Sequence, residues 1–139
     1  MRAVADTNTV ISGLLWQGPP RQVLDAAREG RIELYTSAAL LAELEEVLVR
    51  EKFARRLELA RISVRELVTG YAALANLVEP IAIPPVIAED PDDDAVLACA
   101  VAAQAETIAS GDSHLLKLKD YQNIPILTAA EFLARLPAE

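Results

Sequence analysis

Short apolar segments alternate with longer amphipathic segments along most of the chain. The short segments are typical of buried β-strands, and the long ones of α-helices whose apolar residues recur about every 3.6 positions. The pattern predicts strands over residues 2–5, 32–36, 78–83, 106–110 and 124–127. It predicts helices over residues 10–16, 21–29, 37–50, 53–60, 63–77, 94–104, 112–118 and 128–136.

Strands that alternate with helices are typical of an α/β protein with a parallel sheet covered on both faces. The chain has 139 residues, which is the size of one ordinary domain. It shows no internal repeat and no linker-like stretch. We therefore expect residues 1–139 to form a single domain around an aliphatic core.

The cysteine content and the apolar segments predict where the protein resides. The chain has one cysteine, Cys99, inside an apolar run, which excludes an internal disulfide framework and favours a reducing compartment. The N-terminus does not resemble a signal peptide. The apolar segments fall short of the roughly 20 residues that span a bilayer. We expect a soluble, cytoplasmic protein that does not bind membranes.

The densest chemical signal is an acidic stretch at residues 89–94, which holds five of the 21 acidic residues. An apolar segment that starts at Ala95 follows it directly. Capping of that helix would use one or two of these carboxylates. A divalent cation would use several, because hard cations prefer oxygen ligands. Asp92, Asp93 and Asp94 exceed what one helix end requires.

Two further acids follow predicted strands. Asp6 comes directly after the first strand, and Asp112 comes after the strand over 106–110. In open α/β sheets, ligands bind at the carboxyl ends of the strands, so these acids and the 89–94 stretch are expected to converge. Each acid also has a purely structural explanation as a turn or helix-cap residue.

The long helix after the second strand offers a fourth acid. At about 100° per residue, its apolar stripe centres near Leu44. Glu46 falls almost opposite the stripe and is expected to face solvent. Glu43 and Glu45 flank the stripe on opposite edges, so periodicity does not choose between them.

The net charge of −8 argues against simple electrostatic binding of nucleic acid. The charge is uneven, however, because six of the 13 cationic residues lie between Arg50 and Arg65. An acidic body with one basic segment is compatible with a polyanionic substrate that also requires metal ions. The alternative for the basic segment is a solvated helix face.

Four motifs, in this order, resemble a PIN domain. They are Asp6-Thr7-Asn8 after a strand, Glu43 in a leucine-rich helix, Asp90-Pro91-Asp92-Asp93-Asp94 before an alanine-rich helix, and Ser110-Gly111-Asp112 after a strand. The chain is most similar to the PIN-like toxin nucleases of prokaryotic toxin–antitoxin systems. The resemblance implies a three-layer α/β/α fold with a mostly parallel sheet, and a metal-dependent ribonuclease.

The resemblance also implies which residues hold Mg²⁺ or Mn²⁺ and catalyse the reaction. The first, second and fourth acids fall on Asp6, Glu43 and Asp112. The third falls on Asp93 or Asp94, and the choice stays open. Polar neighbours expected to support the metal or orient its waters are Thr7, Asn8, Asp90 and Ser110. His114 is expected to be a surface residue without a catalytic role.

The resemblance implies partners as well. The substrate would be RNA, with its backbone held by the basic residues Arg50, Lys52, Arg55 and Arg56. A cognate antitoxin protein and a homodimer are the expected protein partners.

Two other functions are consistent with parts of the sequence. One is a phosphoryl-transfer protein, receiver-like or phosphatase-like, with Asp6 as nucleophile. A receiver would need a lysine after the strand over 124–127, and the paired-aspartate phosphatases would need an acid where Asn8 stands. The other is a non-catalytic binding module that has kept the fold.

Overall fold

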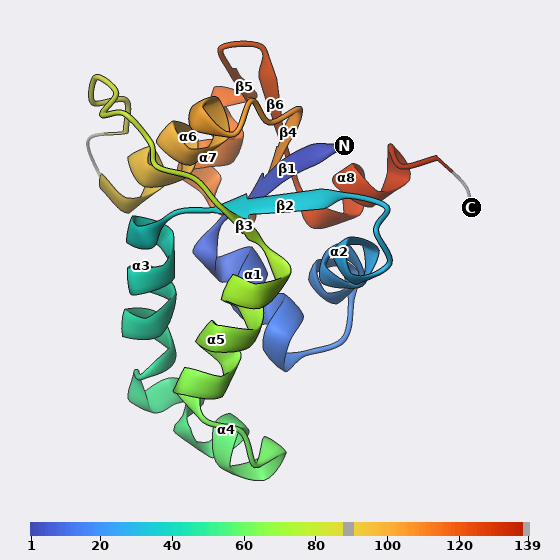
Figure 1. The fold of residues 1–139 in the computed structure, drawn as a ribbon, viewed down its shortest axis with the longest axis vertical. Coiled ribbons are helices and arrows are strands. Elements are labelled where there is room, and N and C mark those ends of the chain that lie inside the picture. Colours follow the sequence, from blue (N-terminus) through green and yellow to red (C-terminus); the bar gives the residue numbers. More distant parts are fainter. Residues whose placement is uncertain (88–90, 138–139) are drawn as a thin grey trace.

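The computed structural model describes residues 1–87 and 91–137, and the strands in these residues form one sheet. The strands are β1 (Arg2–Ala5), β2 (Glu33–Thr36), β3 (Asn76–Leu77), β4 (Thr107–Ala109), β5 (Asp120–Tyr121) and β6 (Ile124–Leu127). Their order across the sheet is β3-β2-β1-β4-β6-β5 (Figure 1). Neighbouring strands are parallel, except that β5 and β6 form an antiparallel pair.

Helices connect the strands and cover both faces of the sheet. They are α1 (Thr7–Leu15), α2 (Pro19–Arg28), α3 (Ala38–Leu48), the short 3₁₀ helix η1 (Glu51–Phe53), α4 (Ala54–Ala60), α5 (Val64–Leu74), α6 (Pro91–Ala102), α7 (Ser113–Leu118) and α8 (Ala129–Ala134). In Figure 1, α6 and α7 lie on one side of the sheet, and α1, α2 and α5 lie on the other. The predicted three-layer α/β/α fold with a mostly parallel sheet is confirmed.

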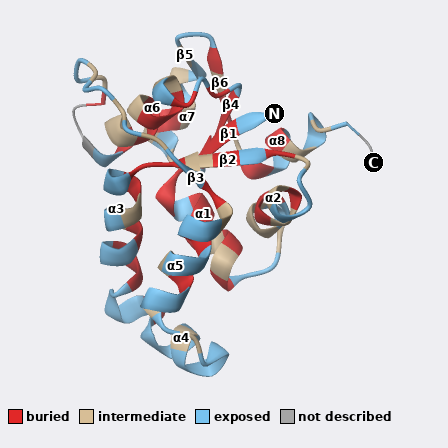
Figure 2. Cartoon of the chain, in the orientation of Figure 1, coloured by how far each residue is buried: buried red, intermediate tan, exposed pale blue. Residues whose placement is uncertain are grey.

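The alternation of side chains along the strands builds a separate core on each face. In β1, Ala3 and Ala5 belong to the core shared with α1, α2, α3, α5 and α8, whereas Val4 belongs to the core shared with α6 and α7. All three residues are at most 3% exposed. Figure 2 shows buried residues in the sheet and on the inner helix faces, whereas α4 is mostly exposed.

The structure differs from several of the predicted elements and boundaries. The strand expected over residues 78–83 is absent, since β3 ends at Leu77 and residues 78–87 have no regular structure. This segment contains prolines, which lack the N–H group that a sheet ladder requires. The helix predicted to reach residue 77 ends at Leu74. The short antiparallel strand β5 was not predicted at all.

Within the part of the chain that the structure describes, each helix is too short or too polar to cross a bilayer.

Alanine substitutions at two helical glycines, one crowded and one not, test how closely α1 and α2 pack. Gly13 lies inside α1, and a Cβ atom there would stand 2.8 Å from both the Pro20 carbonyl oxygen and Leu24 Cδ1. We expect Gly13→Ala to lower the free energy of unfolding by about 1–3 kcal/mol, because a backbone oxygen cannot move away easily. Gly70 lies inside α5 with open space around it, so Gly70→Ala should raise stability by about 0.5–1 kcal/mol. Denaturant unfolding of both variants measures the difference, and equal effects would contradict the close approach.

Candidate metal centre

The candidate site lies at the carboxyl ends of β1 and β4, which are adjacent and parallel. Asp6 follows β1, and Ser110 follows β4. The Asp6 N–H continues the ladder by donating to the Ala109 carbonyl oxygen at 3.0 Å. The two polar residues therefore meet at one edge of the sheet.

Three donors hold the Asp6 carboxylate in one orientation. Asp6 is the N-cap of α1, and its Oδ1 accepts a hydrogen bond from the Thr9 N–H at 2.8 Å. Its Oδ2 accepts from the Ser110 hydroxyl at 2.5 Å and from the Gly111 N–H at 3.3 Å. Asp6 is only 3% exposed. Each carboxylate oxygen has two acceptor positions, so Oδ1 retains capacity for a further ligand.

Ser110 also connects Asp6 to Asp112. Its hydroxyl oxygen accepts from the Asp112 N–H at 3.0 Å. Asp112 is in turn the N-cap of α7, and its Oδ1 accepts from the N–H groups of His114 and Leu115 at 2.8 and 3.2 Å. Asp112 Oδ2 makes no hydrogen bond to any described residue, so this oxygen is available to a cation.

Asp93 brings a third acid to the same place from the first turn of α6. It is 7% exposed. Among the described residues, Asp93, Asp112 and His114 form a group whose ligand atoms all lie within 4.8 Å of one another. The contact joins α6 to α7, which are separated in sequence by β4.

Asp94 has different surroundings, although it is adjacent to Asp93. Its Oδ1 accepts from the Ile87 N–H at 2.9 Å, and both of its oxygens lie 3.3 Å from the Val86 nitrogen. Asp94 therefore binds the backbone that precedes α6. Asp90, predicted as a supporting acid, lies outside the described residues.

The three glutamates of α3 differ in exposure. Glu43 is half-buried, whereas Glu45 and Glu46 are exposed. Glu45 lines a groove between α3 and α5 together with Val49 and Val68. Helix α3 packs against α1, whose N-cap is Asp6, and against α6, which contains Asp93. Of the two glutamates that periodicity left open, Glu43 has the burial expected of a site residue.

The two predicted supporting residues after Asp6 point to different places. Thr7 is buried and lines a small cavity with Tyr71 and Leu44. Burial raises the pKa of the Tyr71 hydroxyl far above its usual value, and the Cys99 thiol and the Asp6 carboxylate raise it further. Tyr71 therefore stays neutral and forms an uncharged wall near Asp6. Asn8 is exposed and faces a different, larger pocket.

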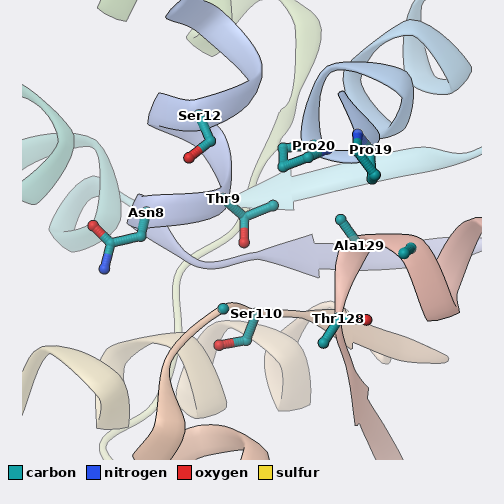
Figure 3. Close-up of a pocket in the computed structure, with 10 residues that line it drawn as sticks. Asn8, Thr9, Ser12, Pro19, Pro20, Ser110, Thr128 and Ala129 are labelled. Carbon is teal, nitrogen blue, oxygen red and sulfur yellow. The ribbon is translucent and has the colours of Figure 1, made fainter. Parts of the chain in front are cut away.

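That larger pocket has a volume of about 390 Å³ and adjoins the acidic site at Ser110 and Gly111. Figure 3 shows its side chains converging from the start of α1, the start of α2 and the segments after β4 and β6. The lining is uncharged and consists of Asn8, Thr9, Ser12, Pro19, Pro20, Ser110, Gly111, Thr128, Ala129 and Ala130. Hydroxyl and amide groups next to proline rings suit a ligand that is partly polar and partly apolar.

The basic residues predicted to bind RNA follow α3, in η1 and α4 and just before them. Arg56 has a structural role there, because its Nε and Nη2 donate to the Leu15 carbonyl oxygen at 2.9 and 2.5 Å. Its guanidinium also lies 5.7 Å from the centre of the Trp16 ring. Lys52 Nζ lies 5.0 Å from the centre of the Phe53 ring, and Arg50 and Arg55 are exposed.

His114 is the residue whose position the sequence did not suggest. It was expected on the surface without a role, and 41% of its side chain is indeed exposed. Its Nδ1 nevertheless lies 3.8 Å from Asp112 Oδ1, beside Asp93. The spacing Asp112-Ser113-His114 was a usable signal, because an N-cap residue and the residue two positions later share the first turn of a helix.

The donor set fits a divalent metal ion. Buried or half-buried carboxylates from three segments distant in sequence supply oxygen ligands, which hard cations prefer. Asp93 and Asp112 lie together beside His114, and Asp6 is tied to Asp112 through Ser110. A cation would also offset the repulsion between these negative charges.

The chain was also compared with known protein families and solved structures. A family model described as the PIN domain matches residues 2–114. Among solved structures, the T. brucei RRP44 PIN domain is 19% identical, with a TM-score of 0.46, and the match covers 95% of this chain and 78% of that one. No curated protein matches the chain significantly.

Proposed function

Because the chain belongs to the PIN-domain family, whose members are generally nucleases, we propose that it is a metal-dependent endoribonuclease that cleaves RNA phosphodiester bonds. The observation that carries the proposal is the convergence of Asp6, Asp93 and Asp112 at one edge of the sheet. These acids lie on three different segments, and one helix cap would not require them to meet.

We assign the metal ligands to Asp6, Glu43, Asp93 and Asp112, with Mg²⁺ or Mn²⁺ as the ion. When bound, such an ion lowers the pKa of a water molecule and stabilises negative charge on the phosphate and the leaving oxygen. The protein's own contribution is orientation. Thr9, Ser110 and Gly111 fix the Asp6 carboxylate, and the first turn of α7 fixes Asp112.

The protein need not supply its own nucleophile. A phosphoryl-transfer reaction on Asp6 would require its carboxylate to reach a phosphate. Asp6 is 3% exposed and three donors already hold its two oxygens. These contacts favour a fixed ligand over an attacking group. A non-catalytic binding module would not need a buried carboxylate group of this kind.

The neutral pocket beside the acids suits one nucleotide of the RNA strand. It shares Ser110 and Gly111 with the site, and its volume of about 390 Å³ is adequate for a base and its ribose. Arg50, Lys52 and Arg55 remain available to hold the phosphate backbone further along. Arg56 is less suited to this role, because its guanidinium is bound to α1.

We further propose a cytoplasmic toxin of a toxin–antitoxin pair that acts as a homodimer and is inhibited by its antitoxin. The support is the resemblance of the four motifs to PIN-like toxins. The groove between α3 and α5 and the exposed Val49, at 63%, are compatible with a protein partner on that face.

Cleavage of labelled single-stranded RNA by the purified protein tests the nuclease proposal. We expect cleavage with Mn²⁺ or Mg²⁺ and complete loss with EDTA, because the clustered carboxylates need a cation to approach a phosphate. Restoring activity by adding excess Mn²⁺ after EDTA is the control for damage by the chelator. Metal-independent cleavage, or neither cleavage nor metal binding under any condition, would contradict the proposal.

A further inference from the structure

We propose that His114 is a nitrogen ligand of the divalent ion held by Asp93 and Asp112, so that the centre is a mixed nitrogen–oxygen site selective for Mn²⁺ over Mg²⁺. The inference rests on the proposed metal centre. It adds His114 as a ligand, and with it a preference for Mn²⁺ that carboxylates alone do not provide.

The distances suit one shared ion. The ligand atoms of Asp93, Asp112 and His114 all lie within 4.8 Å of one another. Two ligands that each stand about 2.1 Å from one ion are at most about 4.2 Å apart. Closing the remaining few tenths of an ångström requires only side-chain rotation, and 41% of the His114 side chain is exposed and free to rotate.

The imidazole is not committed to another contact. Its Nδ1 lies 3.8 Å from Asp112 Oδ1, which is beyond hydrogen-bond distance. That oxygen already accepts two backbone N–H groups, from His114 itself and from Leu115. Among the described residues, the His114 ring makes no hydrogen bond. Both the ring and Asp112 Oδ2 can therefore turn toward an ion.

The helix cap holds these two ligands in a fixed relation. Asp112 is the N-cap of α7, and His114 follows on the first helical turn. Capping fixes the backbone of both residues before any metal binds, so only their side chains need to turn toward a cation. Asp93, which is 7% exposed, supplies the third ligand from α6.

An imidazole ligand changes which metal the site prefers. Mg²⁺ selects oxygen ligands and retains its waters, whereas imidazole suits transition metals. We expect the protein to bind Mn²⁺ more tightly than Mg²⁺. His114→Gln should weaken Mn²⁺ binding by about tenfold or more and Mg²⁺ binding by less than about threefold. If His114 acted only through its charge, it would alter both affinities equally.

Pulsed electron paramagnetic resonance of Mn²⁺ bound to the full chain tests this directly. Modulation from a coordinated ¹⁴N nucleus is expected in the parent protein and in a Ser113→Ala control, and it should disappear in His114→Gln. Calorimetric titration with Mn²⁺ and with Mg²⁺ supplies the two affinities, and thermal unfolding shows whether each variant is folded.

The outcomes separate this inference from the proposed function. Bound Mn²⁺ without a nitrogen signal in the parent protein would overturn the role of His114 and leave the carboxylate centre intact. Equal losses of Mn²⁺ and Mg²⁺ affinity in His114→Gln would also overturn it. Failure of the parent protein to bind Mn²⁺ at all would overturn the metal centre and this inference together.

Discussion

Asp6→Asn is expected to reduce metal-dependent RNA cleavage by about 100-fold or more while leaving the protein folded. The substitution removes a negative charge from the proposed site. It also places an amide nitrogen where one carboxylate oxygen stands, and Oδ2 faces two donors, Ser110 and Gly111. Both the charge and the orientation of the metal ligand are lost.

The fold should survive this substitution. Asparagine is as good an N-cap as aspartate, so the hydrogen bond from the Thr9 N–H can persist. The Ser110 hydroxyl can rotate to meet an amide, which leaves the Gly111 N–H as the main loss. We expect less than about 2 kcal/mol of destabilisation in the absence of metal. Thermal unfolding without metal measures this, and RNA cleavage at saturating Mn²⁺ measures the activity.

Asp25→Asn is the matched control for Asp6→Asn. It makes the same chemical change on α2, where Asp25 forms a surface ion pair with Arg28 at 2.8 Å. Such exposed pairs contribute little to stability, so both cleavage and unfolding should match the parent. If Asp6→Asn cleaved RNA as fast as Asp25→Asn, Asp6 would not belong to the catalytic site.

The strands that carry the site were predictable because they are short apolar runs with polar ends. The predictions for β1 and β6 match the structure residue for residue, and Asp6 follows the first of them. The apolar residues of the segment 78–83 gave a false strand. Ile81 is 85% exposed there, and the preceding Pro80 lacks the N–H group that a sheet ladder requires. Apolar content alone does not show whether a segment has the N–H groups for pairing.

The long-range contacts of the site were less predictable. Periodicity placed Glu43 and Glu45 on opposite edges of the apolar stripe of the helix and did not distinguish them. The packing of α5 beside α3 shows that Glu45 lines the groove between these two helices. The His114 ring in α7 lies close to Asp93 in α6, and the local sequence pattern carries no information about the distance between residues of different helices. The acids that follow strands were predictable for a different reason: parallel strands bring their carboxyl ends to one edge whatever lies between them.

Asp93→Asn and Asp94→Asn are expected to have opposite consequences, although the residues are neighbours with the same chemistry. Asp93→Asn should weaken Mn²⁺ binding by about tenfold or more and cleavage by about 100-fold, because Asp93 is the buried acid beside Asp112 and His114. Its effect on stability without metal should be small or favourable, since one of several mutually repelling charges is removed.

Asp94→Asn should instead lower stability and leave metal binding nearly unchanged. The Asp94 carboxylate accepts the N–H groups of Val86 and Ile87, and Ile87 is a 5% exposed member of the core beneath α6. An amide retains one acceptor but loses the negative charge that strengthens these hydrogen bonds. We expect a loss of about 1–2 kcal/mol in the free energy of unfolding.

Calorimetric titration with Mn²⁺ and denaturant unfolding without metal, applied to both variants, resolve the third acid of the site. The assignment to Asp93 requires that Asp93→Asn lose Mn²⁺ affinity and that Asp94→Asn lose stability. The reverse pattern would make Asp94 the ligand and would mean that its hydrogen bonds to residues 86 and 87 break when metal binds. Retention of full Mn²⁺ affinity by both variants would exclude this turn of α6 from the site. Adjacent helix residues project about 100° apart. One of the two side chains can therefore bind the ion while the other accepts hydrogen bonds from the backbone of residues 86 and 87.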